Sequence, residues 1–373
     1  MSGMSWKSRE DEALDRHRRF FNREMQDGIL ATLPARSDVP PEHWAAFDSK
    51  WGKFKEGERR PFPCNEEIFD REMIRLEYRS KAEDDWLPVV YSILDAGESM
   101  VGGMFGSPME FIHRPGGPAV SMAEHFLSDY AMMKDLHFSL ENEWTARFLD
   151  IQDYFRDHMA GRFAQHPCLT VDALNFACEL RGATQSYIDI YEYPEELRHL
   201  MEIGLDFNTR FQDAQLERCG TCKGGSFNWL GQWVPFERSV SLSVDAYVIC
   251  SVENYVEFGF DYQKRLVEHF DNNGFLHFHC NRADLAAEVA KLPLKLFQYG
   301  QDSRDTMSSF ERLPEMRAAV GDIPIQVEIS LAEFQDGLAA GTLPPNVWYQ
   351  VGWGSLAVDE ANRLMEKVRK YRK

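Results

Sequence analysis

The chain has 373 residues, of which 44% are hydrophobic and 13% aromatic, and its formal net charge is −19. This length suits one α/β barrel with an extension, and the apolar fraction supplies a sizeable core. The negative charge argues against nucleic acid and anionic membranes as partners, because both require a basic surface.

Two further features of the sequence indicate in which cellular compartment the protein works. The first seven residues contain no apolar signal segment, and no apolar run approaches the ~20 residues that cross a bilayer. Seven cysteines are an odd number in a large chain, which fits reduced thiols. We therefore expect a cytoplasmic enzyme.

The first 85 residues are predicted to be mainly helical. Residues 8–27 are densely charged and carry apolar residues at helical intervals, which is typical of an exposed amphipathic helix. Prolines interrupt residues 34–63 and favour short helices and loops there, and residues 64–79 are again predicted to form a helix. We expect residues 1–85 to be an N-terminal helical extension that packs on the main body.

From Trp86 onward, short apolar runs are followed by helical segments. Asp172 is placed to cap a helix that Gly182 ends, and Pro194 opens a long helix. The glycines in residues 97–106 match neither a dinucleotide-binding nor a phosphate-loop spacing, so no nucleotide is expected.

The C-terminal part repeats one pattern. Strands are predicted at residues 274–279, 294–299, 323–329 and 347–352, with helical segments between and after them. Each unit takes about 20 to 30 residues, the repeat of a β/α pair. We therefore predict that residues 86–373 form a single (β/α)8 TIM barrel.

Two histidines interrupt one of these apolar strands. Since side chains alternate along a strand, His277 and His279 point to the same face and can share a ligand, a proton or a metal ion. A histidine near a strand end is usually a satisfied core or surface residue, but two at this spacing favour a pocket. Catalytic zinc usually has three protein ligands, so a third must come from elsewhere.

The active site of such a barrel lies at the carboxyl ends of its strands. Glu328 ends an apolar run, and partial burial would raise its pKa toward the range of a general acid or base. Without a metal, His277 and Glu328 could transfer protons. The residues predicted to contact a small-molecule substrate are Trp229, Gln232, Trp233, Asp245, Gln298, Tyr299, Gln301 and Trp353.

Cys219 and Cys222 have the spacing of half a zinc site or of a redox pair. No second pair of cysteines accompanies them. Ordinary loop thiols are therefore the favoured interpretation.

Four segments, taken in their order and spacing, resemble the uroporphyrinogen decarboxylase superfamily, which includes zinc-dependent corrinoid methyltransferases. They are residues 172–182, 245–260, 276–281 and 296–300. The resemblance spans about the C-terminal two thirds of the chain. It implies a (β/α)8 barrel with N-terminal helices.

The chain departs from both branches of this superfamily. True decarboxylases carry the motif Met-Arg-Gln-Ala-Gly-Arg, whereas residues 18–23 here read Arg-Arg-Phe-Phe-Asn-Arg. The methyltransferases bind zinc through His-x-Cys and a cysteine at the last strand, whereas here His279 stands at the first cysteine position and residues 351–354 contain no cysteine. The resemblance therefore implies His277, His279 and Glu328 as the metal ligands.

The function that these features favour is methyl transfer involving a corrinoid protein and a small methylated substrate or thiol. Zinc would lower the pKa of such a thiol. The alternatives are a decarboxylase of the uroporphyrinogen type and a non-catalytic barrel that binds a small polar metabolite. We also expect a homodimer, because symmetric pairing is common.

Overall fold

The computed structural model describes residues 7–35, 39–53, 55, 57–59, 62–92, 100–112, 120–159, 161, 163–279, 281–302 and 305–373. Within them the centre of the α/β fold is a parallel sheet of six strands in the order β1-β12-β11-β10-β9-β8. The strands are β1 (Leu30–Thr32), β8 (Val240–Ser243), β9 (Gly274–Phe278), β10 (Leu294–Tyr299), β11 (Ile325–Ser330) and β12 (Val347–Gly352).

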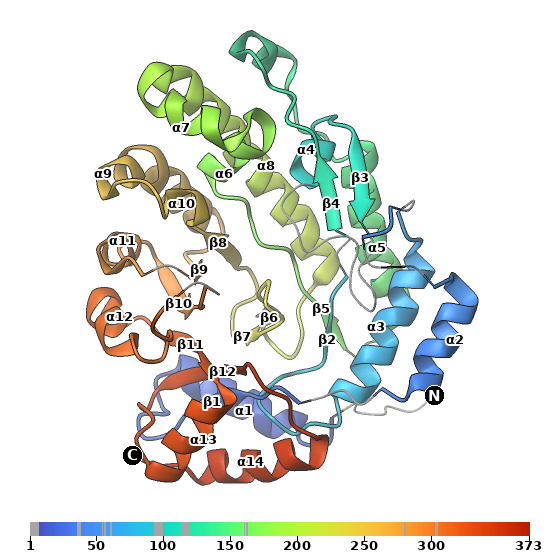
Figure 1. Ribbon diagram of the computed structural model, residues 1–373, viewed down its shortest axis with the longest axis vertical. Helices are drawn as coiled ribbons and strands as arrows, with labels where there is room; N and C mark the ends of the chain where they lie inside the picture. Colours follow the sequence, from blue (N-terminus) through green and yellow to red (C-terminus); the bar gives the residue numbers. More distant parts are fainter. Residues whose placement is uncertain are drawn as a thin grey trace.

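Helices from the C-terminal two thirds of the chain form an arc outside this sheet (Figure 1). They are α6 (Ala173–Arg181), α7 (Ala183–Glu192), α8 (Pro194–Cys219), α9 (Val252–Tyr255), α10 (Asp261–His269), α11 (Ala283–Val289), α12 (Leu313–Val320), α13 (Leu331–Ala340) and α14 (Val358–Lys370). Asp172 caps α6 by accepting hydrogen bonds from the backbone of Leu174 and Asn175, and Gly182 ends the helix, as predicted.

A second parallel pair lies beside the main sheet. It consists of β2 (Val89–Val90) and β5 (Ala164–Gln165). On one side, the Asp85 amide donates to the Ala31 carbonyl at 3.1 Å, and on the other the Thr170 amide donates to the Ser241 carbonyl at 3.0 Å. Backbone hydrogen bonds therefore connect the residues flanking this pair to β1 and to β8, the two edge strands of the main sheet.

The remaining elements lie at several places around the sheet (Figure 1). They are α2 (Pro41–Trp51), α3 (Asn65–Arg79), α4 (Met100–Met104), α5 (Glu143–Met159), the single-turn segments η1 (Tyr130–Asp135), η2 (Asp245–Tyr247) and η3 (Val256–Phe260), and the hairpins β3–β4 (Met109–Ile112 and Val120–Ala123) and β6–β7 (Ser226–Phe227 and Trp233–Val234). Among the described residues, none of the helices combines the length and apolar character that a membrane crossing requires.

The N-terminal segment is not only a helical extension. Strand β1 pairs with β12 in register, from Leu30 opposite Trp348 to Thr32 opposite Gln350. The expected division at residue 85 would have placed this strand outside the main body, whereas it belongs to the central sheet. The pairing joins two segments at opposite ends of the chain, and no local sequence pattern reports such a partner.

Helix α1 (Glu10–Phe21) is more buried than its charge suggested. Arg16 and His17 are both buried, because Arg16 bonds the Asp85 carboxylate and His17 Nε2 contacts the Asp85 carbonyl at 2.7 Å. Phe20 joins an apolar cluster with residues of β1, β7, β9, β10 and β12. The helix therefore packs against the inner face of the sheet, which corrects the expectation of an exposed helix.

The two faces of the sheet differ in chemistry. Phe278, Phe297 and Tyr299 belong to the large core beneath the outer helices, and the alternate positions His277, Gln298 and Gln326 lie side by side on the inner face. The inner face is therefore polar at the level of these residues. This arrangement brings the histidine strand to the interior of the curved sheet.

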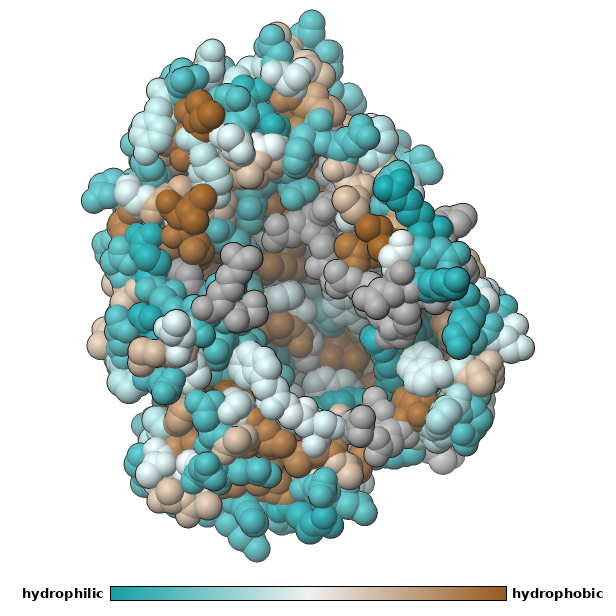
Figure 2. All heavy atoms as spheres, in the orientation of Figure 1, coloured by the Kyte–Doolittle hydropathy of each residue, from teal (hydrophilic) through white to brown (hydrophobic). Residues whose placement is uncertain are grey.

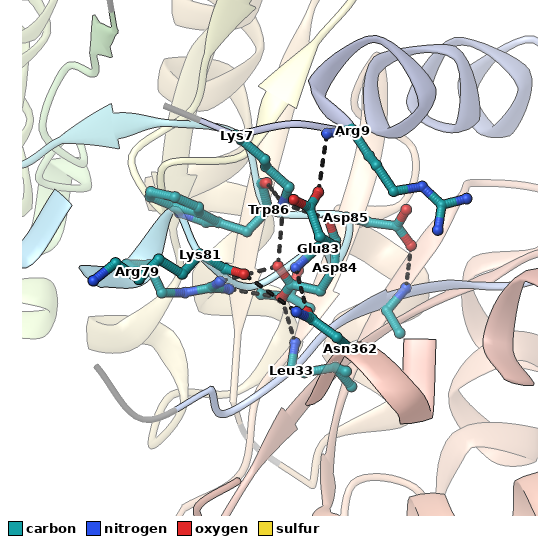
Figure 3. A network of polar contacts seen from close by, with 12 residues as sticks. Lys7, Arg9, Leu33, Arg79, Lys81, Glu83, Asp84, Asp85, Trp86 and Asn362 are labelled. Carbon is teal, nitrogen blue, oxygen red and sulfur yellow. Dashed lines mark hydrogen bonds and ion pairs between the residues drawn. The ribbon is translucent and has the colours of Figure 1, made fainter. Parts of the chain in front are cut away.

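A buried ionic network around Asp84 joins the N-terminal residues to the segment between α3 and β2 (Figure 3). Asp84 accepts from Arg79 Nη1 and Nη2 at 3.0 and 2.6 Å, from the Leu33 amide at 2.8 Å, and from Lys7 Nζ at 3.3 Å. Burial raises the pKa of Asp84, but the charges of Arg79 and Lys7 outweigh burial and hold this pKa below its ordinary value. The network fastens the residues between α3 and β2 to the end of β1.

Candidate functional site

Two adjacent strands bring two histidines and a carboxylate close together. His277 lies in β9 and His279 directly follows it, whereas Asp245 begins the turn η2 just after β8. Ser243 of β8 pairs with His277, so the ends of these strands lie together. One potential ligand atom from each of Asp245, His277 and His279 lies within 4.8 Å of the other two.

His279 lies between two carboxylates. Its Nε2 is 2.9 Å from Asp245 Oδ1, and its Nδ1 is 2.8 Å from Asp302 Oδ1. The hydrogen bond to Asp245 is the main cause that raises the pKa of His279 to about 9, with a smaller contribution from Asp302. When nothing else binds there, His279 is therefore an imidazolium at neutral pH.

His277 has the opposite electrostatics. Burial lowers its pKa, which keeps the imidazole neutral. Its Nδ1 contacts Gln298 Oε1, and since an amide oxygen only accepts, Nδ1 carries the hydrogen and Nε2 keeps its lone pair. The Trp229 ring meets His277 edge-on at 5.0 Å between centroids and forms one wall beside it.

Glu328 is near the histidines, but its carboxylate binds a backbone amide. Its Oε2 accepts a hydrogen bond from the Gln301 amide at 2.9 Å. Burial raises its pKa, as the sequence predicted. Among the described residues, the carboxylate that groups with the two histidines is Asp245 and not Glu328.

Two cavities adjoin this region. The first, which we call the apolar cavity, has a volume of ≈ 200 Å³ and is lined by Trp229, Asp245 and His277 together with Met, Phe and other residues, some of them polar. The second, the polar cavity, has a volume of ≈ 320 Å³ and includes His17, Thr32, Gln232, Trp233 and Gln350. In Figure 2 this face of the molecule is hollowed near its middle, and apolar residues line part of the hollow.

The predicted substrate residues are thus divided between different surroundings. Tyr299 lies outside both cavities, because strand alternation turns it away from Gln298 into the outer core, where its hydroxyl donates to Asn281 Oδ1 at 3.1 Å. Trp353 is 56% exposed at the end of β12 and lines neither cavity. The side-chain oxygen of Gln301 accepts from the Ser309 amide at 3.3 Å.

Several contributors were not singled out from the sequence. One of them is Gln326, which donates to Gln350 Oε1 at 3.2 Å within the interior. Asp302, in contrast, was expected at the end of a predicted strand, and it orients His279. The signal for the interior glutamines was present: polar residues alternate with apolar ones in β11. His17 gave no comparable signal, since its helix has many polar residues. Cys280, which follows His279, lies outside the described residues.

The donor set fits a divalent transition metal. Two imidazoles and one carboxylate are ligands that zinc accepts in catalytic sites. Metal-bound histidines usually donate their second ring nitrogen to an oxygen, and here both Nδ1 atoms meet one, from Gln298 and from Asp302. The Nε2 atoms remain for the metal, beside Asp245 Oδ1.

Comparison with known proteins supports the fold. No protein-family model matches this sequence, and no curated protein matches it. The structure is similar to that of a methyltransferase from Methanosarcina mazei, with a TM-score of 0.59 and 10% sequence identity over 99% of both chains. At this identity the likeness shows a methyltransferase-related fold and does not transfer an activity.

Proposed function

We propose that this protein is a metal-dependent methyltransferase whose metal is held by Asp245, His277 and His279 inside a (β/α)8 barrel. The observation that carries the proposal is that each histidine meets an oxygen acceptor at Nδ1 while both lie within reach of Asp245. A proton-transfer site alone would not require this paired orientation. The similarity to a methyltransferase over almost the whole chain favours the same reaction class.

The barrel is proposed from the hydrogen bonds that flank the short strands. Strands β1, β2, β5 and β8 to β12 would be its eight members, all parallel to their neighbours where they pair. The bonds from Asp85 to Ala31 and from Thr170 to Ser241 would close the ring where regular pairing stops. The proposed site then lies at the carboxyl ends of β8 and β9, the usual position in such barrels.

Zinc, when bound, would supply a Lewis acid that lowers the pKa of a coordinated thiol. The chain's own residues would prepare this step. Neutral His277 offers its lone pair, whereas His279 must first release a proton. Asp302 and Gln298 hold the two rings in place. Glu328, whose pKa is raised by burial, is placed near them to take the proton of the thiol. The thiolate sulfur would then bond to the methyl carbon as the bond from that carbon to its donor breaks and the donor keeps the electron pair.

The methyl group would be exchanged with a second protein. We propose that the methyl group is exchanged with a corrinoid carried by a second protein, that the methylated compound or thiol is small, and that the enzyme acts as a homodimer in the cytoplasm. The methyltransferase-related fold and the cavity volumes support a small substrate.

A metal-free acid–base enzyme, such as a decarboxylase, is the second candidate. The observation that favours it is the charge of His279, which two carboxylates stabilise as an imidazolium that can donate a proton. In this case Asp245 and Asp302 would act only by positioning the ring.

Metal analysis of the purified protein separates these functions. We expect about one zinc per chain, lost in Asp245→Asn, His277→Ala and His279→Ala but retained in the matched carboxylate variant Glu328→Gln. Absence of metal from the native protein, after growth with added zinc, would reject the methyltransferase proposal. Stoichiometric zinc without methyl transfer to any thiol in the presence of a methylated corrinoid would point instead to a non-catalytic barrel.

A further inference from the structure

The apolar cavity occupies the place where regular strand pairing is interrupted between β5 and β8. Its walls come from Met100, Val101 and Met104 of α4, Phe148 of α5 and Phe207 and Phe211 of α8. The residues at the interruption, 168–171, form another side. The cavity therefore reaches from His277 outward toward the helices, away from the polar interior.

Its size limits what it can hold. An engineered apolar cavity of about 150 Å³ binds benzene, and the volume here is ≈ 200 Å³. One six-membered ring with a few attached atoms fits this space, whereas a tetrapyrrole does not. Flexible methionine side chains from α4 adapt to the outline of such a ring and interact favourably with its edge.

Polar residues also line this cavity, among them Thr170, Asn208 and Gln212. Gln212 of α8 is 1% exposed, and its Nε2 donates to the Cys168 carbonyl at 2.7 Å. Within the described part of the chain its Oε1 has no hydrogen-bond partner, although this atom is fully buried. A buried acceptor without a donor costs about 1–3 kcal/mol, so a ligand that brings a hydroxyl to this atom gains affinity.

We propose that the apolar cavity binds a small phenol. The aromatic ring lies among the Met and Phe side chains, its hydroxyl donates to Gln212 Oε1, and its other substituent faces Trp229 and His277. This assignment names the substrate class of the proposed methyltransferase, and it rests on that function only for what happens at the His277 end. Recognition of the ring and hydroxyl needs no metal.

The test compares 4-methoxyphenol with methoxybenzene, which differ by the hydroxyl alone. Binding of each is measured by calorimetry and by Trp fluorescence on full-length protein treated with a chelator. We expect 4-methoxyphenol to bind about three- to tenfold more tightly than methoxybenzene, the effect of one net hydrogen bond. The variant Gln212→Met should abolish this preference while retaining binding of methoxybenzene.

The chain offers a matched control. Gln152 is also fully buried, its Oε1 also has no partner among the residues that the structure describes, and it does not line the cavity. The variant Gln152→Met should therefore keep the preference for 4-methoxyphenol. A second variant, Val101→Phe, should fill the cavity and weaken both probes at least tenfold, with its folding checked by the thermal unfolding midpoint.

The outcomes distinguish this inference from the proposed function. If zinc binds with the expected stoichiometry but neither aromatic probe binds, the phenol assignment is overturned and the methyltransferase proposal stands. Equal affinity of the native protein for both probes would also overturn it, because Gln212 would then play no part in recognition. Selective phenol binding by a protein that holds no zinc would support the cavity assignment and reject the metal-dependent function.

Discussion

His279 is the residue whose protonation state links the two candidate functions. Its pKa of about 9 means that a metal must replace a proton at neutral pH. We predict that the apparent zinc affinity rises up to about tenfold per pH unit below pH 9 and levels off above it. Competition titrations with a chromogenic chelator between pH 6.5 and 9.5 measure this slope. A flat profile would show that His279 is not a ligand.

The same raised pKa has a consequence for the metal-free protein. A histidine whose pKa is raised by folding contributes stability below its unfolded pKa of about 6.5, and this contribution is lost as the pH rises through about 9. The variant His279→Gln should lack this loss. Urea unfolding of both metal-free proteins across that pH range provides the control for the titrations.

Gln298 and Tyr299, which are adjacent in β10, give a second prediction about single residues. Gln298 faces the site and orients His277, whereas Tyr299 faces the outer core. Gln298→Met should therefore weaken zinc binding about 10- to 100-fold. Tyr299→Phe should leave zinc binding unchanged and cost about 0.5–1.5 kcal/mol of stability through its lost hydrogen bond. If both variants weakened zinc binding equally, the assignment of Gln298 to the site and of Tyr299 to the outer core would be wrong.

The sequence identified part of this site. The spacing of His277 and His279 was enough to predict a shared ligand, since strand alternation is a local property. It assigned Glu328 as their partner, whereas the carboxylate within reach of both histidines is Asp245. Both carboxylates follow or end apolar runs, and which of them reaches the histidines depends on strand register and turn geometry that only the tertiary structure determines.

At the scale of elements, the strands with long apolar runs were predicted well. Residues 294–299 and 347–352 match β10 and β12 at both ends. The pairs β2–β5 and β6–β7 have strands of only two residues, too few for periodicity to report their ends or their pairing. Their positions depend on hydrogen bonds to distant segments, which the local sequence does not encode.

The network around Asp84 provides a prediction about the join between β1 and β2. The variant Asp84→Asn would leave Lys7 and Arg79 buried without the charge that compensates them. We expect a loss of about 3–5 kcal/mol in the free energy of unfolding. The exposed pair of Arg59 and Glu110 is the control, where Glu110→Gln should change stability by less than about 0.5 kcal/mol. If Asp84→Asn and Glu110→Gln both lowered the free energy of unfolding only slightly, Asp84 would not have this structural role.

At the scale of the molecule, β1 and α1 are parts of the main body. Removing residues 1–35 would expose the edge of β12 and the apolar cluster around Trp348. We predict that the truncated chain fails to unfold cooperatively, as measured by circular dichroism on heating. A cooperative transition near that of the full chain would support the division at residue 85 that the sequence suggested.

The pairing of β1 with β12 also bears on how the protein is made. Ribosomes add about 5–20 residues per second, so β1 waits roughly 15–60 s for its partner strand to be synthesised. During this time its apolar residues and unpaired backbone are accessible to chaperones and to other nascent chains. Correct biogenesis therefore depends on protecting the first strand until the last one leaves the ribosome.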